Sequence, residues 1–279
     1  MKETNNKSTT ITIDKLTPFE GHPFKVIDNE EMNELVASIQ TLGILDPLIV
    51  RPIENTQDRY EIISGHRRYR AALKAGITQI PALIIPMSRD EAAIALVDSN
   101  LHRDHILPSE RAFSYKLKLE ALKHQGTSVQ LGPKLTASTI EEGKSASQVK
   151  RYIRLTNLIP EILDMVDSGK IALTPAVEIS YLSNEEQEVL LDVMDFEDCT
   201  PSLSQAVKLK KLSQSQELTK DGIFDIMSQL KANQKEKISF KVDDIKGYFP
   251  KSYDTGQIQK TIIKLLNDYK RKRQRDLER

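Results

Sequence analysis

The first hundred residues carry short apolar runs that alternate with amphipathic segments. Four runs have the length and side-chain character of strands, at residues 11–13, 48–51, 60–63 and 80–85. Three other segments repeat apolar residues at helical spacing, at residues 30–42, 67–75 and 90–100. Strands and helices mixed at such short intervals predict an α/β domain over residues 10–107.

From Pro108 onward the pattern is helical almost to the end, which predicts an all-helical domain over residues 108–200. Within it, residues 139–155 predict a short helix, a turn at Gly143 and a second helix that Ser145 caps. That second helix would turn its apolar side chains inward and leave polar and basic ones outside, namely Ser145, Ser147, Gln148, Lys150, Arg151 and Arg154.

This unit has the form in which a helix-turn-helix enters the major groove of double-stranded DNA. Its basic residues would contact phosphates, and its Ser and Gln side chains could reach base edges. DNA binding is therefore the preferred interpretation. The alternative is an ordinary helical hairpin with a basic surface.

Three further segments complete the expected organisation. Residues 1–9 are polar and predict a disordered tail, and residues 201–237 are polar enough to act as a linker. Residues 238–279 would form a small C-terminal segment that ends in a basic run. Since a lone helix is marginal in water, the apolar stripe of this segment predicts a homodimer through Ile258, Ile262, Leu265, Leu266 and Tyr269.

The sequence Ser64-Gly65-His66-Arg67-Arg68 stands where a strand-like run stops and a helix-like run begins. A turn followed by a helix start leaves backbone N–H groups unpaired, with the positive end of the helix dipole behind them. Two arginines in a first helical turn suggest that a ligand phosphate supplies the negative charge. An ordinary strand-turn-helix with solvated arginines is the alternative on the motif alone.

Composition limits the other function classes. The 279 residues include 40 basic and 40 acidic ones, so DNA binding must depend on local segregation of charge. The single Cys199 excludes an intramolecular disulfide and argues against a cysteine-based zinc site. No apolar run reaches membrane-spanning length and the start is not a signal peptide, so we expect a cytoplasmic protein that does not enter a membrane.

Several motifs in this order resemble the ParB family of DNA-partitioning proteins. Residues 42–50 are similar to the family's first nucleotide motif, residues 65–71 to its phosphate motif, and residues 99–103 to its third motif. The helix-turn-helix and residues 169–174 also fall at the family's positions. The resemblance covers most of residues 10–182 and implies a ParB/sulfiredoxin-like α/β domain, then the helix-turn-helix domain, then a dimerisation segment.

The resemblance also implies a switch: the family binds CTP with Mg²⁺, loads at a centromere-like (parS-like) site and closes as a clamp on DNA. Carried over, Gly43 and Leu45 would lie by the cytidine, Asn100 would help to hold the metal, and the rest of the nucleotide site would comprise Ser64, Gly65, His66, Arg67, Arg68 and Arg103. A ParA-type ATPase is the implied partner, through the N-terminal tail. A plasmid or mobile-element role with nucleoid or plasmid association is expected.

Hydrolysis of the nucleotide is left open, because His66 and Ser99 stand where the family usually has Glu. The main alternative is a helix-turn-helix transcription regulator that hydrolyses no nucleotide. A ParB-like nuclease would need a metal cluster, for which His102, Asp104 and His105 are the candidates, and is less favoured. Sulfiredoxin-like phosphotransfer needs a thiol near the phosphate turn, whereas Cys199 is distant in sequence.

Overall fold

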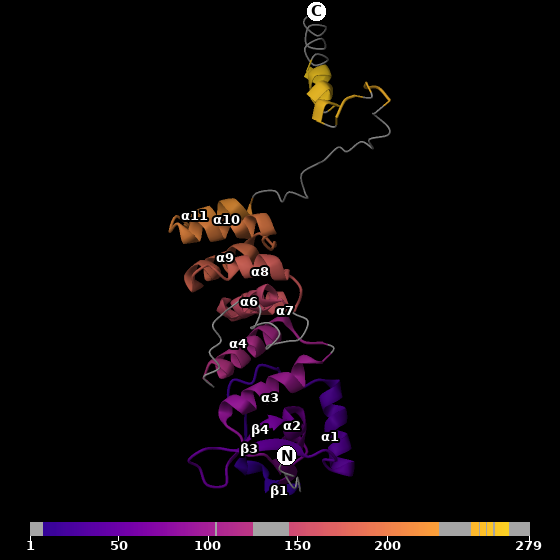
Figure 1. Cartoon of the computed structure of the whole chain (residues 1–279), viewed down its shortest axis with the longest axis vertical. Coiled ribbons are helices and arrows are strands. Elements are labelled where there is room, and N and C mark those ends of the chain that lie inside the picture. Colours follow the sequence, from indigo (N-terminus) through magenta and orange to yellow (C-terminus); the bar gives the residue numbers. More distant parts are fainter. Residues whose placement is uncertain are drawn as a thin grey trace, which may run out of the picture. The chain divides into compact units, whose positions relative to one another are not determined.

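The computed structural model describes residues 8–103, 105–124, 145–228, 247–250, 252–254, 256–258 and 260–267. The chain divides into two units, Met1–Gln229 and Leu230–Arg279. The first unit contains the sheet and the helices described below, and Figure 1 shows their order along the chain.

A mixed five-stranded sheet organises the N-terminal part. Its strands lie in the order β1-β5-β3-β4-β2, with β1 Thr9–Thr12, β2 Leu16–Pro18, β3 Leu48–Pro52, β4 Tyr60–Ser64 and β5 Gln79–Ile84. The β1/β5 and β3/β4 pairs are antiparallel, whereas β2/β4 and β3/β5 are parallel. Leu48, Val50, Ile62 and Ile80 are fully buried, so the strands form a core of their own.

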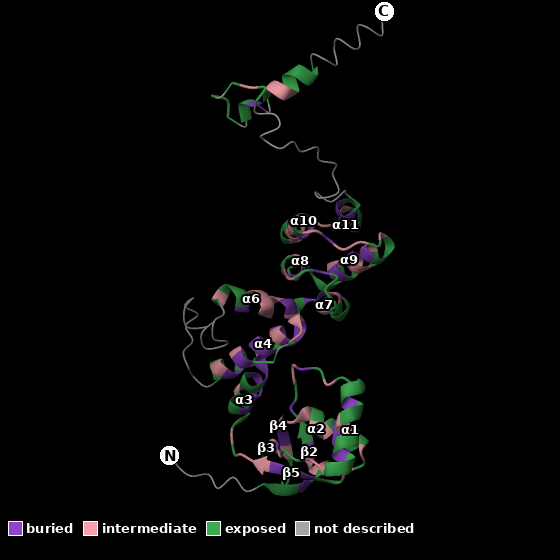
Figure 2. Cartoon of the chain, turned by 90° about the vertical axis from the view of Figure 1, so that its right-hand side faces the viewer, coloured by how far each residue is buried: buried purple, intermediate pink, exposed green. Residues whose placement is uncertain are grey.

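Three helices alternate with the strands. Helix α1 Glu30–Leu42 follows β2, α2 His66–Lys74 follows β4, and α3 Arg89–Leu101 follows β5. The 3₁₀ turn Ile13–Lys15 joins β1 to β2. Helix α1 packs on α2 through a small cluster of Met32, Ile39 and Ala71, which fixes α2 at the end of β4 (Figure 2). The α/β fold agrees with the sequence prediction, and β2 is the strand that the pattern missed because it has only three residues.

The helical part comprises α4 Pro108–His124, α6 Ala146–Arg154, the 3₁₀ turn Leu155–Asn157, α7 Pro160–Asp167, α8 Leu173–Ile179, α9 Asn184–Phe196, α10 Leu203–Gln214 and α11 Lys220–Met227. The α/β part and the helical part are not separated by a domain boundary at residue 108, where the sequence predicted one. Phe19 and Ile63 share one buried cluster with Tyr115 of α4 and Val149 of α6. Helix α3 bridges the two parts, since it packs on both β4 and α4.

Residues 201–237 were expected to be a linker, and this expectation was wrong for α10 and α11. Ala206, Leu209 and Ile223 are buried in the helical core, and Gln205 Nε2 donates to the carbonyl of Ile226 at 2.9 Å. Each of these helices has a narrow apolar stripe and a larger number of polar residues on its outer face, so the segment is polar on average. Residues 229–237 lie outside the described residues.

In the C-terminal unit, residues 256–258 and 260–267 are helical. Ile258 is buried, whereas Ile263, Leu265 and Leu266 are exposed. Tyr269 and the basic run after it lie outside the described residues, as do residues 1–7 of the predicted tail. None of the described helices combines the length and the apolar content needed to cross a membrane.

Candidate functional site

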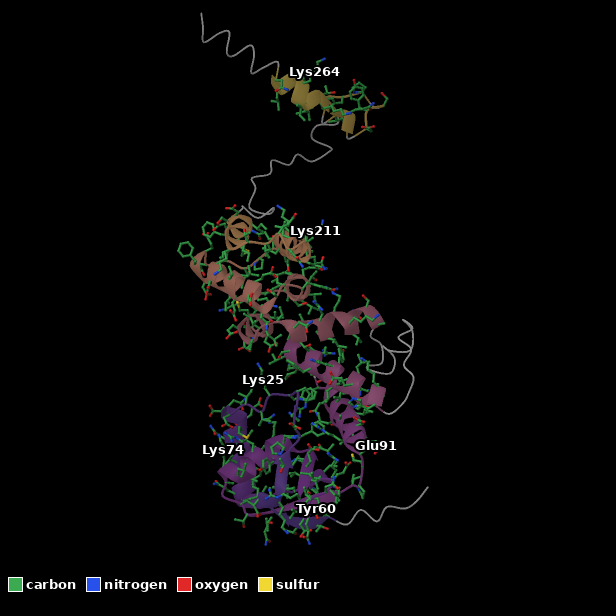
Figure 3. The ribbon with its side chains drawn as sticks, turned by 90° about the vertical axis from the view of Figure 1, so that its left-hand side faces the viewer. Lys25, Tyr60, Lys74, Glu91, Lys211 and Lys264 are labelled. Atoms are coloured by element: carbon green, nitrogen blue, oxygen red, sulfur yellow. The ribbon has the colours of Figure 1, made fainter. Side chains whose placement is uncertain are left out.

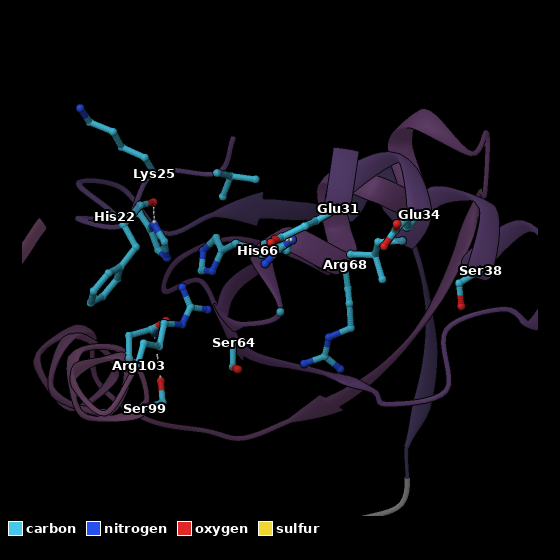
Figure 4. A pocket seen from close by; sticks show the side chains of 16 residues that line it. His22, Lys25, Glu31, Glu34, Ser38, Ser64, His66, Arg68, Ser99 and Arg103 are labelled. Carbon is cyan, nitrogen blue, oxygen red and sulfur yellow. Dashed lines mark hydrogen bonds and ion pairs between the residues drawn. The ribbon is translucent and has the colours of Figure 1, made fainter. Parts of the chain in front are cut away.

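A cavity of about 580 Å³ lies where the end of β4 meets α1, α2, the end of α3 and the segment after β2 (Figure 4). Seven of the nine residues predicted for nucleotide binding line it: Ser64, Gly65, His66, Arg67, Arg68, Asn100 and Arg103. They come from positions up to 39 residues apart, so the fold brings two separate motifs to one place.

The turn at Ser64–Gly65 shapes this cavity. Gly65 is the N-cap of α2 and has φ 102°, a backbone conformation that residues with a side chain adopt at a cost. A Cβ at this position would lie 2.9 Å from Cγ of the buried Leu48. The helix ladder begins with the N–H of Tyr69 donating to the carbonyl of Gly65, so the amides of the preceding turn have no intrahelical acceptor. The turn therefore has the form of an anion cradle.

The two arginines of the turn have different surroundings. Arg67 is exposed, and its Nη2 lies 3.1 Å from Oε2 of Glu31 on α1. Arg68 is half-buried, and its Nη1 donates to the carbonyls of Asp46 and Pro47, the latter at 3.1 Å. Arg68 thus holds the chain before β3 against α2, while Arg67 is the more available for a ligand.

His66 lies against His22 beside these arginines, with ring centroids 3.8 Å apart and the ring planes tilted by 42° (Figure 4). His66 Nε2 accepts from the N–H of Phe19 at 3.4 Å, and His22 Nδ1 lies 2.7 Å from the carbonyl of Phe24, to which it must donate. Burial, followed by the charges of His22 and Arg103, lowers the pKa of His66 to about 3. Burial also lowers the pKa of His22, so both rings are neutral near pH 7.

This histidine pair should make the protein less stable in mild acid. Below pH 6.5 the unfolded chain protonates His66, whereas the folded chain does not until pH about 3, so stability falls as the pH drops through that window. Between pH 7 and pH 5 we expect His66 to account for a loss of at most about 2 kcal/mol in the free energy of unfolding. Urea unfolding across this range would measure it.

The variant His66→Gln should flatten the pH dependence, and His105→Gln, a change at an exposed position, is its matched control. An unchanged pH profile in His66→Gln would show that the neutral His66 is not the cause.

The third motif lies at the end of α3. Asn100 is buried, and its Nδ2 donates to the carbonyl of Leu96 at 2.8 Å and to Ser99 Oγ at 3.2 Å, which leaves Oδ1 as the atom available to a cation. Glu31 and Glu34 of α1 line the same cavity. An amide oxygen and carboxylates are ligands that suit Mg²⁺, which also keeps water and phosphate oxygens. The donor set therefore fits Mg²⁺, although the described residues contain no group of three acidic, His or Cys side chains.

Two predicted residues do not line the cavity. Gly43 is the C-cap of α1, with φ 73° and its N–H donating to the carbonyl of Ile39, and Leu45 is 76% exposed. Sequence reasoning missed the lining residues of two other segments, namely His22, Phe24, Lys25 and Val26 before α1 and Glu31, Glu34, Leu35 and Ser38 on it. The spacing of Glu31, Glu34 and Ser38 could have revealed one face of α1, whereas residues 22–26 have no periodicity.

The candidate DNA-reading helix is α6, which begins at the predicted Ser145. Ser145 Oγ accepts from the N–H of Gln148, and Gln148 Oε1 accepts from the N–H of Ser145, each at 3.2 Å. Ser145, Ser147, Gln148 and Lys150 are exposed, as a DNA-facing surface requires. The preceding turn at Gly143 lies outside the described residues.

Arg151 and Arg154, by contrast, are directed to α8 and the turn after it. Arg151 Nη2 donates to Thr174 Oγ1 at 2.8 Å, and Arg154 Nη2 donates to the carbonyl of Ser180 at 2.9 Å. The Arg154 guanidinium also lies 3.9 Å from the ring centroid of Tyr181. These contacts hold α6 in place, and they give Arg154 a structural role that its position in the sequence did not reveal.

Arg154→Ala should therefore lower the free energy of unfolding by about 1–3 kcal/mol, because it removes a charge-assisted hydrogen bond and a cation–π contact. Lys150→Ala is the matched surface variant and should change stability by less than about 0.5 kcal/mol. Urea midpoints would distinguish them, and equal midpoints would argue against the structural role.

Residues 1–101 match the family described as ParB N-terminal domain. The nucleoid occlusion protein of Bacillus mycoides (strain KBAB4) is 32% identical over 220 residues, which cover 76% of this chain and 72% of the relative. The chain belongs to the ParB family. The probable chromosome-partitioning protein ParB of Coxiella burnetii is 32% identical over 187 residues, which cover 66% of this chain and 59% of that protein.

Among solved ParB structures, the C-terminally truncated protein from Caulobacter crescentus complexed with CTP-gamma-S is 28% identical. That match covers 64% of this chain and 94% of the other, with a TM-score of 0.33. The same protein complexed to the centromeric parS site is 24% identical, covering 75% and 100%, with a TM-score of 0.41.

His66 is neutral near pH 7 and stands where the family resemblance led us to expect a carboxylate. Of the three nuclease candidates, His102 and His105 are exposed and do not line the cavity, and Asp104 lies outside the described residues. Cys199 packs against the core of the helical part, away from the phosphate turn.

Proposed function

We propose that this ParB-family protein binds CTP with Mg²⁺ in its N-terminal cavity and uses the nucleotide to switch from loading at a DNA site to a closed clamp. The observation that carries the proposal is the convergence of the phosphate turn, Asn100 and Arg103 on one cavity. Unpaired amides, a helix dipole and fixed positive charge favour a polyphosphate there. The choice of CTP rests on the family resemblance.

Bound Mg²⁺ would neutralise phosphate charge, with Asn100 Oδ1 as its protein ligand. Arg67 and the first-turn amides would bind the phosphate oxygens, and Arg103 would add charge from the opposite wall. His66 could donate from Nδ1, because its Nε2 already accepts from Phe19. A neutral imidazole cannot serve as the acidic metal ligand of the usual motif, so we expect slow hydrolysis or none.

The DNA partner would be a double-stranded, centromere-like site, read by the exposed face of α6. The names of the relatives, a chromosome-partitioning and a nucleoid occlusion protein, support action on DNA. The remaining parts of the proposal are a homodimer through residues 238–279 and a ParA-type ATPase that binds residues 1–9. Association with a nucleoid or a plasmid would follow from them.

Calorimetry with CTP, ATP and GTP, each with Mg²⁺ and with or without site DNA, tests the nucleotide part. We expect binding of CTP in preference to the other two. Binding of none of the three would overturn this function.

The second candidate is a helix-turn-helix transcription regulator without nucleotide hydrolysis. One observation favours it: Arg67 and Arg68 both have partners within the protein, as they would in a site that holds no phosphate. Specific DNA binding by the wild-type protein, together with no binding of CTP, ATP or GTP, would support this alternative.

A further inference from the structure

Residues 19–25, here called the strap, lie between two cavities. His22 and Lys25 line the phosphate-turn cavity, and both also line a second cavity of about 460 Å³ against α4 and α7. Figure 3 shows Lys25 where the α/β part meets the helices that follow it. One short segment therefore forms a wall of the candidate nucleotide site and a contact surface of the helical part.

On the side of the phosphate turn, the strap is joined to the groups that would meet a ligand. The N–H of Phe19 donates to His66, and the His22 ring lies against the same imidazole. The Arg103 guanidinium lies 5.8 Å from the ring centroid of Phe24. A ligand that moves the first turn of α2 or Arg103 thus acts on groups that hold the strap.

On the other side, Lys25 is fixed to the start of α4 and to the end of α7. Its N–H donates to Glu110 Oε1 at 2.8 Å, and Glu110 Oε2 accepts from the N–H of Leu107 at 3.0 Å, at the start of α4. Its Nζ lies 3.2 Å from Asp164 and 3.3 Å from Asp167 at the end of α7.

Asp167 joins the same group of contacts, because it also accepts from the N–H of Ser109 at 2.9 Å. The side chains of Asp167 and Lys25 are 8% and 49% exposed, and Glu110 is 8% exposed. Buried carboxylates that lose a partner are costly, so Glu110 and Asp167 resist separation from the strap. The exposed Asp164 contributes less.

We infer that the strap couples the phosphate-turn cavity to the helical part through Lys25, Glu110 and Asp167, so that ligand in the cavity and DNA on α6 alter each other's affinity. The inference rests on the proposed function and assigns its coupling residues. A ligand shifts an equilibrium only by its differential affinity for the two states, and the coupling is reciprocal. The strap connects the two binding regions because Lys25 contacts Glu110 at the start of α4, and α4 packs on α6.

The test uses the full chain with Asp164→Asn and Asp167→Asn combined, which removes both negative charges from Lys25 at constant side-chain size. Neither residue lines the phosphate-turn cavity. Glu161→Gln, an exposed position on the same helix, is the matched control. The affinity for site DNA is measured by fluorescence anisotropy with and without CTP, and the ratio is the coupling factor.

We expect the coupling factor to fall at least about threefold in the double variant and to stay unchanged in the control, with CTP affinity in the absence of DNA within about threefold of wild type. Hydrogen exchange at Ser109 and in α7 should respond to CTP in the wild type and not in the double variant. If the double variant loses stability, Glu110→Gln provides the same comparison.

Three failures are distinguishable. A wild-type protein that binds neither CTP nor tripolyphosphate overturns the proposed function and the strap coupling with it. A wild-type protein that binds CTP but shows no coupling overturns the CTP switch and the strap inference, and leaves nucleotide binding in place. A double variant that keeps the full coupling factor overturns the strap inference alone.

Discussion

Gly65→Ala should destabilise the protein by about 1–3 kcal/mol and weaken nucleotide binding by about a hundredfold. The φ of 102° is unfavourable for Ala, and its Cβ would lie 2.9 Å from Cγ of Leu48, which is fully buried and has no free space to move into. The turn must shift to relieve this contact, and the first-turn amides of α2 shift with it. Calorimetry with CTP and urea unfolding would measure the two effects.

Gly76→Ala is the matched control for this change. Gly76 follows the same helix and has φ 72°, but a Cβ there would meet nothing within 4 Å. It should cost stability through the backbone alone and leave nucleotide affinity near wild type, because Gly76 does not line the cavity. Equal nucleotide affinities in both variants would rule out the close approach at Gly65 as a requirement of the site.

Arg67→Ala should weaken CTP binding by one to two orders of magnitude, since a charge-assisted hydrogen bond to phosphate contributes about 1.5–3 kcal/mol. Its side chain is 43% exposed, and its partner Glu31 is 69% exposed. An ion pair of this kind contributes little to folding, so the melting temperature should hardly change. Titration calorimetry and thermal unfolding on the same samples would separate binding from stability.

Arg70→Ala serves as the control, because Arg70 belongs to the same helix, pairs with Asp28 and does not line the cavity. It should keep wild-type CTP affinity. If Arg67→Ala also keeps wild-type CTP affinity, Arg67 does not bind phosphate, and its role is to join α2 to α1 through the ion pair with Glu31. Arg68 is less suited to this experiment, because its contacts with Asp46 and Pro47 would make a stability loss hard to separate from a binding loss.

The phosphate turn could be predicted from sequence because its signals are local. Gly65 between a strand and a helix, and two arginines after it, require only the order of a few residues. The convergence of residues 64–68 with Asn100 and Arg103 was implied by family resemblance, since periodicity cannot relate segments so far apart.

The role of the strap, the role of Arg154 and the packing of α10 and α11 could not be predicted, because they depend on tertiary contacts that leave no periodic signal in the sequence. The strap is a loop whose role follows from its partners, Glu110 and Asp167, which lie 85 and 142 residues from Lys25. On a helical wheel Arg154 lies on the outer face of α6, which predicted a DNA contact. Its structural role follows from its hydrogen bond to the carbonyl of Ser180, just after α8. The packing of α10 and α11 in the helical core was missed because the polar composition of residues 201–237 outweighed a narrow apolar stripe on each helix.

In the proposed DNA-reading role of α6, the reciprocal cap at the start of this helix limits the base edges that Gln148 can recognise. Its oxygen accepts from the N–H of Ser145 at 3.2 Å and from Ser145 Oγ at 3.4 Å, so both acceptor positions are used and the side chain has only its amide N–H groups for a partner outside the protein. Bidentate pairing with adenine needs an amide that donates and accepts at once, whereas the guanine edge presents only acceptors at N7 and O6. While the cap is intact, Gln148 is therefore suited to guanine, and reading adenine would require the first turn of α6 to give up its own stabilisation.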